Sequence, residues 1–183
     1  APAVQISAGW YGGHTCAVLR DGRVSCWGFN NEGQCGLGNA TWQGVGGSNE
    51  PLPVLDLGGR AALEVRASML HSCVLLDGGS VRCWGSLQSG GLGYPGVEQS
   101  LRPGGDVDVG APAIGLATGT SHTCALLEGG RLRCWGSNGD GQLGYGHAQP
   151  IGMAESPAQA TFQPLTSNPT RLLGGDAVLD GSV

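Results

Sequence analysis

The stretch HTCAVLRDGRVSCWG, which runs from His14 to Gly28, occurs two more times in the chain with small changes. The further copies are HSCVLLDGGSVRCWG, residues 71–85, and HTCALLEGGRLRCWG, residues 122–136. Each copy joins two short apolar runs of strand-forming residues through a turn that contains glycine, and this pattern predicts a β-hairpin. We therefore expect one hairpin, present three times, to organise the fold.

Two cysteines stand at the same positions in every hairpin, and their pairing depends on the turn. A three-residue loop that ends at Gly22, where a left-handed conformation costs glycine little, sets Cys16 opposite Cys26. In this register the two cysteines form a non-hydrogen-bonded pair with Cα atoms about 4.5 Å apart, within the range of a disulfide. A two-residue turn would shift the register and set Cys16 opposite Trp27. We favour the three-residue loop and predict three disulfides: Cys16–Cys26, Cys73–Cys83 and Cys124–Cys134.

Regular cysteine pairs indicate an oxidising compartment, so we expect a secreted or extracellular protein, with the periplasm or a cell surface as alternatives. Zinc binding is the rival interpretation, but the sequence has no CxxC spacing and cross-strand pairing already uses both cysteines of each hairpin. We expect no metal and no cofactor. Cys35 is left over and aligns with Leu92 and Leu143, which favours a small buried hydrophobe over an intermolecular disulfide.

Composition excludes several classes of protein. The 183 residues include 36 glycines without a period of three, which excludes collagen and suits short strands joined by tight turns. Only 13% of residues are charged, the net charge is −5 and lysine is absent, so we expect no nucleic-acid partner. No run approaches the ~20 apolar residues of a membrane span, so we expect no membrane insertion. No motif contains a nucleophile elbow, a phosphate loop or a paired acid and base, so we do not expect an enzyme.

Each hairpin follows a short alternating run and precedes a glycine-rich tail. Apolar residues at every second place of these runs are typical of half-buried strands. The histidines that open the hairpins stand 57 and 51 residues apart (14 to 71, and 71 to 122), a spacing typical of repeat arrays. One unit cannot bury both faces alone, so the copies must pack on one another. We predict one array over residues 1–183, with repeats at about 1–57, 58–110 and 111–173 and the start of a further repeat at 174–183.

The pattern A-x-G-x-x-H-T-x-A-L…G-x-V-x-x-W-G-x-N-x-x-G-Q-L-G, matched best by residues 117–144, resembles the regulator of chromosome condensation repeat. The resemblance extends over the whole chain as three copies, of which the second departs most. The paired cysteines differ from the quoted pattern and resemble those of a secreted bacterial branch of this family. The resemblance implies an all-β fold of β-propeller blades, each a four-stranded antiparallel sheet.

The family's propellers close with more blades than this chain supplies. Residues 173–179 are similar to residues 57–63, which lead into the second copy, so we expect the start of a fourth blade. Three blades and a strand would leave an exposed edge and an apolar face at each end. The sequence therefore predicts either part of a longer chain or several chains that complete the propeller together, and we favour the first.

A histidine opens every copy, and a tryptophan follows its second cysteine. Identical histidines suggest a metal site, but a residue that stands at the same position of every repeat has a structural role in the repeat fold. We therefore expect each histidine to form a hydrogen bond inside its own blade. We expect the tryptophans to pack between blades rather than to form a ligand platform. The residues are His14, His71 and His122, and Trp27, Trp84 and Trp135.

The first repeat carries four aromatic residues that repeat symmetry does not require: Trp10, Tyr11, Phe29 and Trp42. Relative to the third copy, two residues are inserted between the first strand and the histidine, and Trp10 and Tyr11 lie in this insertion. Aromatic residues without a core role are enriched at interfaces, so these four are the candidate binding residues. Packing against a neighbouring blade is the alternative.

We expect an extracellular protein-binding or scaffold module that recognises a protein partner, or itself, through variable loops between the strands. The alternatives are an enzyme inhibitor, as in the secreted β-lactamase inhibitory proteins that share the repeat, and a structural subunit of an extracellular fibre. The nucleotide-exchange role of nuclear family members is opposed by the missing basic tail and the paired cysteines.

Overall fold

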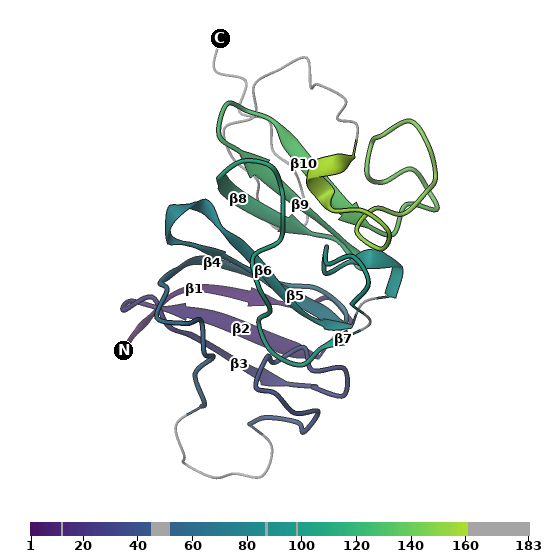
Figure 1. Ribbon diagram of the computed structural model, residues 1–183. Coiled ribbons are helices and arrows are strands. Elements are labelled where there is room, and N and C mark those ends of the chain that lie inside the picture. The colour runs from purple at the N-terminus through teal and green to yellow at the C-terminus, as the bar shows by residue number, and fades with distance from the viewer. Residues whose placement is uncertain (12, 45–51, 87, 98, 161–183) are drawn as a thin grey trace.

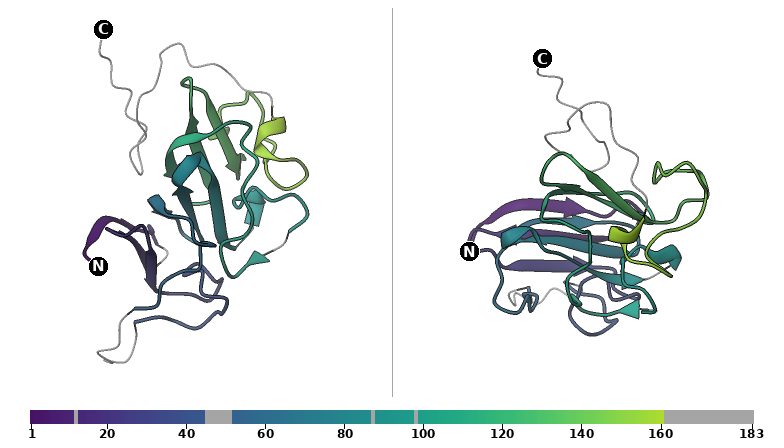
Figure 2. Two further views of the ribbon diagram at one scale, coloured as in Figure 1. Left: turned by 60° about the vertical axis from the view of Figure 1, so that its left-hand side comes forward. Right: turned by 45° about the horizontal axis from the view of Figure 1, so that its top comes forward.

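The computed structural model describes residues 1–160 except 12, 45–51, 87 and 98. The described strands form three antiparallel sheets, which we call blades 1, 2 and 3, and these follow one another in chain order (Figure 1). The left view of Figure 2 shows blade 2 lying between the other two. The predicted all-β class is confirmed. The predicted start of a further repeat, residues 174–183, lies outside the described residues.

Every blade has the same order, in which the second strand lies between the first and the third. Short 3-10 helices lie at Asp77–Gly79 (η1), Gln88–Gly90 (η2) and Pro157–Gln159 (η3). The strands are β1 (Ala3–Ala8), β2 (His14–Leu19) and β3 (Val24–Gly28) in blade 1; β4 (Ala62–Ala67), β5 (His71–Leu76), β6 (Val81–Ser86) and β7 (Gln99–Ser100) in blade 2; and β8 (Ala113–Thr118), β9 (His122–Leu127) and β10 (Leu132–Gly136) in blade 3.

Blade 2 has the predicted fourth strand, β7, which is two residues long. In blade 1, two isolated bridges stand where a fourth strand would pair with β3. They join Gln43 to Gly28 and Val54 to Ser25. Pro53 lies next to the second bridge, and its carbonyl accepts a hydrogen bond from the Ser25 hydroxyl at 2.8 Å. Because proline has no N–H to donate to a ladder, it interrupts pairing in this segment.

The hairpins have the register that a three-residue loop predicts. In blade 1 the Leu19 amide donates to the Arg23 carbonyl at 2.8 Å, and Gly22 has a φ of +80°. Cys16 therefore lies opposite Cys26, with their Cα atoms 4.1 Å apart, and a disulfide joins them. The two other hairpins repeat this arrangement with Cα separations of 4.1 and 4.0 Å.

The hydrophobic core lies between the blades. One cluster joins Cys16 and Val18 of blade 1 to Val65 and Trp84 of blade 2. The second cluster joins the corresponding residues of blades 2 and 3, among them Leu116. Val65, Leu116 and Trp84 are fully buried. Neighbouring blades thus share each cluster of buried apolar residues, as in other repeat folds.

Side chains take the place of backbone partners between the first strands of neighbouring blades. The Gln5 amide nitrogen donates to the Val65 carbonyl at 2.9 Å, and its oxygen accepts from the Val65 amide at 3.1 Å. The Ser7 hydroxyl accepts from the Ala67 amide at 3.0 Å. Between blades 2 and 3 the Glu64 carboxylate accepts from the Leu116 amide at 3.0 Å. These contacts satisfy backbone groups that would otherwise lack a partner at the edge of a sheet.

The repeated histidines bridge blades, which corrects the prediction of a hydrogen bond inside each blade. The Nε2 atom of His14 lies 2.8 Å from the Ser72 hydroxyl of blade 2. His71 makes the same contact with the Thr123 hydroxyl of blade 3, also at 2.8 Å. The prediction failed because the partner is the hydroxyl residue that follows the histidine in the next copy, and sequence alone does not show how blades stack.

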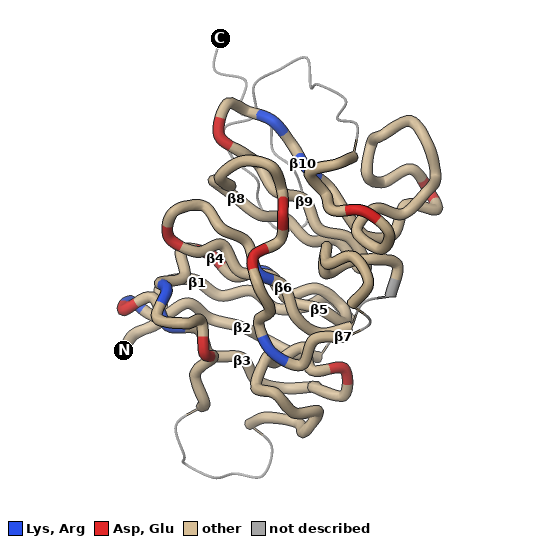
Figure 3. Tube along the Cα trace, in the orientation of Figure 1, with Lys and Arg blue, Asp and Glu red and all other residues tan. Residues whose placement is uncertain are grey.

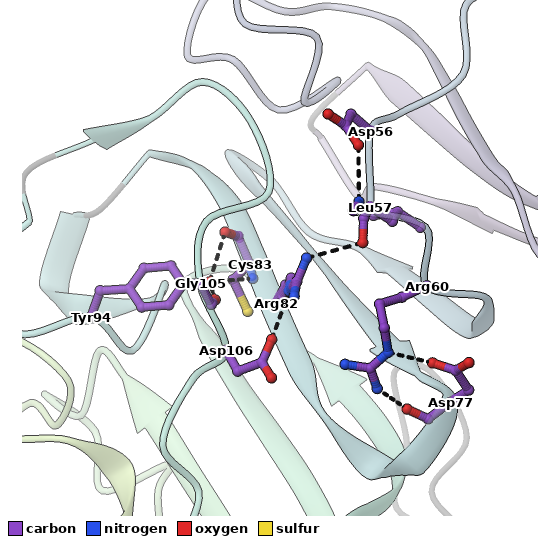
Figure 4. A network of polar contacts seen from close by, with 10 residues as sticks. Asp56, Leu57, Arg60, Asp77, Arg82, Cys83, Tyr94, Gly105 and Asp106 are labelled. Carbon is purple, nitrogen blue, oxygen red and sulfur yellow. Dashed lines mark hydrogen bonds and ion pairs between the residues drawn. The ribbon is translucent and has the colours of Figure 1, made fainter.

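An outer network also joins blades 1 and 2 (Figure 4). The Arg82 guanidinium donates to the Asp106 carboxylate at 2.6 Å and to the Leu57 carbonyl at 3.1 Å. The nearby Tyr94 hydroxyl donates to the Gly105 carbonyl at 2.7 Å and accepts from the Cys83 amide at 2.9 Å. The fourth segment of blade 2 is therefore fixed to its own sheet, and through Arg82 to the preceding blade.

We predict that replacing both Cys73 and Cys83 with alanine lowers the free energy of unfolding by about 2–3 kcal/mol, because the loop that this disulfide closes is about ten residues long. Denaturant unfolding of the oxidised protein and the double variant measures the difference.

Peptide mapping without reduction is expected to show three links within hairpins. Cys35 is expected to stay unalkylated until unfolding, because it is fully buried and burial raises the pKa of its thiol to about 12. A link between different hairpins would contradict the register.

We predict that the protein loses stability in acid through His71. Burial, and secondarily the positive charges of His14 and His122, lowers the pKa of His71 from 6.5 to about 3. The unfolded chain therefore binds this proton more tightly than the folded protein does. The contribution of neutral His71 is complete above pH 6.5 and is lost as the pH falls towards 3, at up to about 1.4 kcal/mol per pH unit.

Denaturant unfolding of the wild type and of His71→Gln across this pH range measures the effect. Glutamine keeps a neutral hydrogen-bonding group and does not titrate, so the variant is expected to show a shallower loss of stability in acid. Equal slopes for the two proteins would contradict the prediction.

Candidate functional site

Two of the predicted binding residues form an exposed stack directly after β1. The side chains of Trp10 and Tyr11 are 78% and 85% exposed, and their ring centroids lie 5.6 Å apart. Tyr11 has a φ of +55°, a left-handed conformation that is uncommon for a bulky residue and costs free energy. The loop thus holds two large aromatic rings in solvent on a strained backbone.

The other two predicted residues form a second pair. Phe29 follows β3, and its ring centroid lies 5.4 Å from that of Trp42. Trp42 is 52% exposed, and its indole nitrogen donates to the Asn31 side-chain oxygen at 2.6 Å. The buried Asn30 side chain donates to the carbonyls of Asn39 and Thr41 and so fixes the loop that carries Trp42.

Both pairs lie at the same end of blade 1. The Phe29 amide donates to the Gly13 carbonyl at 3.0 Å, so the loop with Trp10 and Tyr11 runs beside Phe29. Gly13 has a φ of +61°, and a Cβ atom there would lie 3.3 Å from that of Phe29. The four predicted residues therefore lie as two separate pairs at one end of blade 1, which we call the aromatic end. Phe29 is the most buried of the four.

Trp10 also borders a groove that sequence reasoning did not find. The groove has a volume of about 480 Å³ and lies where the first strands of the three blades end. Its lining includes Trp10 of blade 1, Ser68 and Met69 of blade 2, and Thr120 and His122 of blade 3. In the sequence, the only indication of this groove is that the alternating run that forms the first strand ends at the same position of every repeat.

The groove is lined by both polar and apolar side chains, among them Ile6, Met69 and Ser68, and its one arginine is paired. Arg66 borders it and forms an ion pair with Glu64, so the guanidinium charge is compensated. Burial lowers the pKa of His122, which favours the uncharged imidazole at neutral pH. The Ser68 hydroxyl donates to the Gly119 carbonyl at 2.6 Å and closes the floor between blades 2 and 3. The arrangement suits an uncharged polar or apolar segment better than a phosphate group.

The described residues offer little support for other kinds of site. Among them, no three histidine, cysteine or acidic side chains come together as a metal site. Figure 3 shows arginines scattered over all three blades among acidic residues. Within the same part of the chain, no helix combines the length and apolar character that crossing a membrane requires.

Comparison with known proteins identifies the repeat. Two family models, both described as the regulator of chromosome condensation (RCC1) repeat, match the chain. One matches residues 3–34 and 114–142, and the other matches residues 21–75. Together they span more than half of the chain.

Individual relatives are larger proteins. A probable E3 ubiquitin-protein ligase, HERC6 of Homo sapiens, is 32% identical over 146 residues, which cover 78% of this chain and 14% of the relative. The mitochondrial RCC1 domain-containing protein RUG3 of Arabidopsis thaliana is 31% identical over 147 residues, which cover 78% of this chain and 31% of the relative. The chain therefore spans less than a third of either relative.

Solved structures of low sequence identity share the fold. Yeast RCC1 (Prp20), solved bound to Kap60, superimposes with a TM-score of 0.71 at 19% identity, over 84% of this chain and 36% of that one. Human WBSCR16 superimposes with a TM-score of 0.57 at 19% identity, over 91% of this chain and 54% of that one. The repeat pattern, the stacked blades and the family models agree, and the chain belongs to the regulator of chromosome condensation (RCC1) repeat family.

Proposed function

We propose that the chain is an extracellular protein-binding module and that the aromatic end of blade 1 is its recognition surface. The exposed stack of Trp10 and Tyr11 carries this proposal. Two large rings kept in solvent, on a backbone that is strained at Tyr11, cost free energy in the isolated protein. Aromatic side chains of this kind are enriched among the residues that dominate binding energy.

The neighbouring groove supports a protein ligand. A protein segment that packs on Trp10 can extend into the groove, where Ser68, Thr120 and neutral His122 offer hydrogen-bonding partners without net charge. Blades stacked through buried side chains and hydrogen bonds supply a rigid base for such loops. The solved yeast relative, with which this chain shares the fold, is described as binding Kap60, Gsp1p and histones, all of them proteins.

The extracellular location rests on the cysteines. Six of the seven cysteines form three disulfides within hairpins, and this use of cysteine is typical of oxidising compartments. The family as a whole does not fix the compartment, since one relative is named as mitochondrial.

We predict that Trp10→Ser together with Tyr11→Ser abolishes partner binding and leaves the melting temperature nearly unchanged, because both side chains are exposed and make few core contacts. The measurement is affinity capture from the secreted fraction of the source organism, with wild-type and variant proteins as baits, followed by mass spectrometry. The expected result is a protein captured by the wild type and lost from the double variant.

Met153→Ser serves as the matched control, because Met153 is an apolar side chain that is 51% exposed in the third repeat. The control variant is expected to retain the captured protein. A loss of about 3 kcal/mol or more in unfolding free energy would instead show that Trp10 and Tyr11 are core residues. Unchanged capture by the double variant would contradict the proposal.

A further inference from the structure

The loop after the first strand is rooted in the same way in every blade. The residue directly after β1, β4 and β8 donates its amide to the carbonyl of the histidine that opens the next strand. The three bonds run from Gly9 to His14 at 3.0 Å, from Ser68 to His71 at 2.8 Å and from Gly119 to His122 at 3.0 Å. The residue that follows each root therefore holds the same position of the repeat. This residue is Trp10 in blade 1, Met69 in blade 2 and Thr120 in blade 3.

These three side chains line one groove, the one of about 480 Å³ that Trp10 borders, and we call them the loop row. Trp10 and Thr120 are exposed and Met69 is half-buried. Their position changes from an aromatic ring to a thioether to a small hydroxyl, while the histidine, cysteines and tryptophan of the repeat stay the same. A variable position that faces a groove on a constant frame suits ligand discrimination better than support of the repeat.

The middle member of the loop row shows that the groove does not belong to an end of the blade stack. Blade 2 has a described blade on each side, and Met69 still borders the groove. The groove lies over the ends of the first strands of all three blades. Its presence therefore does not depend on an uncovered blade face.

The roots of the loops touch one another, so the loop row stands on a continuous backbone. A Cβ atom on Gly9 would collide with the Ser68 carbonyl oxygen, which means that the loop of blade 1 lies directly against that of blade 2. The buried Ser68 hydroxyl donates to the carbonyls of Gly119, at 2.6 Å, and of Thr120, at 2.8 Å. The three side chains are thus held in a fixed order across the blades.

Buried tryptophans fix the blades beneath the loop row. Trp84 of blade 2 donates its indole N–H to the Gln34 carbonyl of blade 1 at 2.8 Å. Trp135 of blade 3 donates in the same way to the Gly91 carbonyl of blade 2 at 3.0 Å. Both side chains are fully buried, as expected for tryptophans that pack between blades. A ligand that spans the loop row therefore meets side chains that are already positioned, so binding requires little further ordering of the protein.

The charge and size of the groove limit the kind of ligand. Arg66 is the one arginine in its lining and is paired with Glu64, and no acidic side chain is among the described residues that line it. An ionic ligand therefore finds no free charge there. The volume lies within the range of about 300–1,000 Å³ that small-molecule pockets have, so the groove takes a few residues of a protein and not a folded domain.

We propose that the groove binds an extended, uncharged protein segment, which Trp10, Met69 and Thr120 contact in that order. The segment places large apolar side chains against Trp10 and Met69, and a serine, threonine or asparagine beside the Thr120 hydroxyl. An aromatic ring and a flexible thioether provide apolar contact area, and the hydroxyl provides a hydrogen-bonding group. This inference rests on the proposed function, since Trp10 belongs to both surfaces, and it adds the class of ligand and the residues of blades 2 and 3 that determine its sequence.

The test begins with the selection of short random peptides, displayed on phage, against the immobilised full chain. The wild type is expected to enrich peptides in which two large apolar residues and one uncharged polar residue recur at a fixed spacing. One enriched peptide is synthesised with a fluorescent label, and fluorescence polarisation measures its affinity. Met69→Thr and Thr120→Met are each expected to bind it at least about tenfold more weakly, as for residues that contact a ligand directly.

A change of specificity gives the decisive result. Selection against Thr120→Met is expected to enrich peptides with an apolar residue in place of the polar one. Selection against Met69→Thr is expected to enrich peptides with a polar residue in place of one apolar residue. A peptide altered in this way binds the matching variant more tightly than the wild type, and such coupling between one protein residue and one ligand residue indicates direct contact. Recovered binding also shows that the variants are folded.

Leu63→Thr is the matched control, because Leu63 is an apolar residue of β4 that is 61% exposed and does not line the groove. This variant is expected to bind the labelled peptide like the wild type. A wild type that enriches no common sequence would overturn the inference, and so would a peptide whose affinity is unchanged in Trp10→Ser, Met69→Thr or Thr120→Met. The proposed function is judged separately, by whether the captured protein is lost from the Trp10 and Tyr11 double variant.

Discussion

The whole structure depends on the contact between consecutive blades. A single three-stranded sheet has two faces and cannot cover either of them itself, so its apolar residues are buried only when the next sheet is in place. The repeated residues are used at this junction. Histidine and tryptophan are fixed in every copy because one reaches forward to the next blade and the other reaches back to the preceding one. The disulfides hold each hairpin in the register that presents these side chains correctly.

The sequence was informative wherever the deciding interaction is local. The loop that ends at Gly22 sets the register of its hairpin, and residue counting was sufficient to place Cys16 opposite Cys26. The departures of the first repeat from its own symmetry pointed to Trp10, Tyr11, Phe29 and Trp42, which lie as two pairs at one end of blade 1. Repeat symmetry served here as an internal standard against which an unexplained aromatic residue stands out.

Sequence reasoning was weaker wherever the answer depends on how blades stack. The partner of His14 is Ser72, 58 residues away, and no spacing within one repeat indicates it. The groove beside Trp10 is built from the strand ends of three repeats, so none of its residues forms a local motif. The family pattern also does not show that Gln43 and Val54 pair with β3 through isolated bridges, beside Pro53, which cannot donate to a ladder.

The uniformity of the junction bears on how such a chain can change over generations. Both junctions draw their histidine, hydroxyl residue, tryptophan and tail carbonyl from the same positions of the repeat. A duplicated or deleted segment of one repeat length therefore brings together two surfaces that already fit. Unequal recombination within the gene can lengthen or shorten the array without compensating substitutions, while loops such as the one that carries Trp10 remain free to diverge.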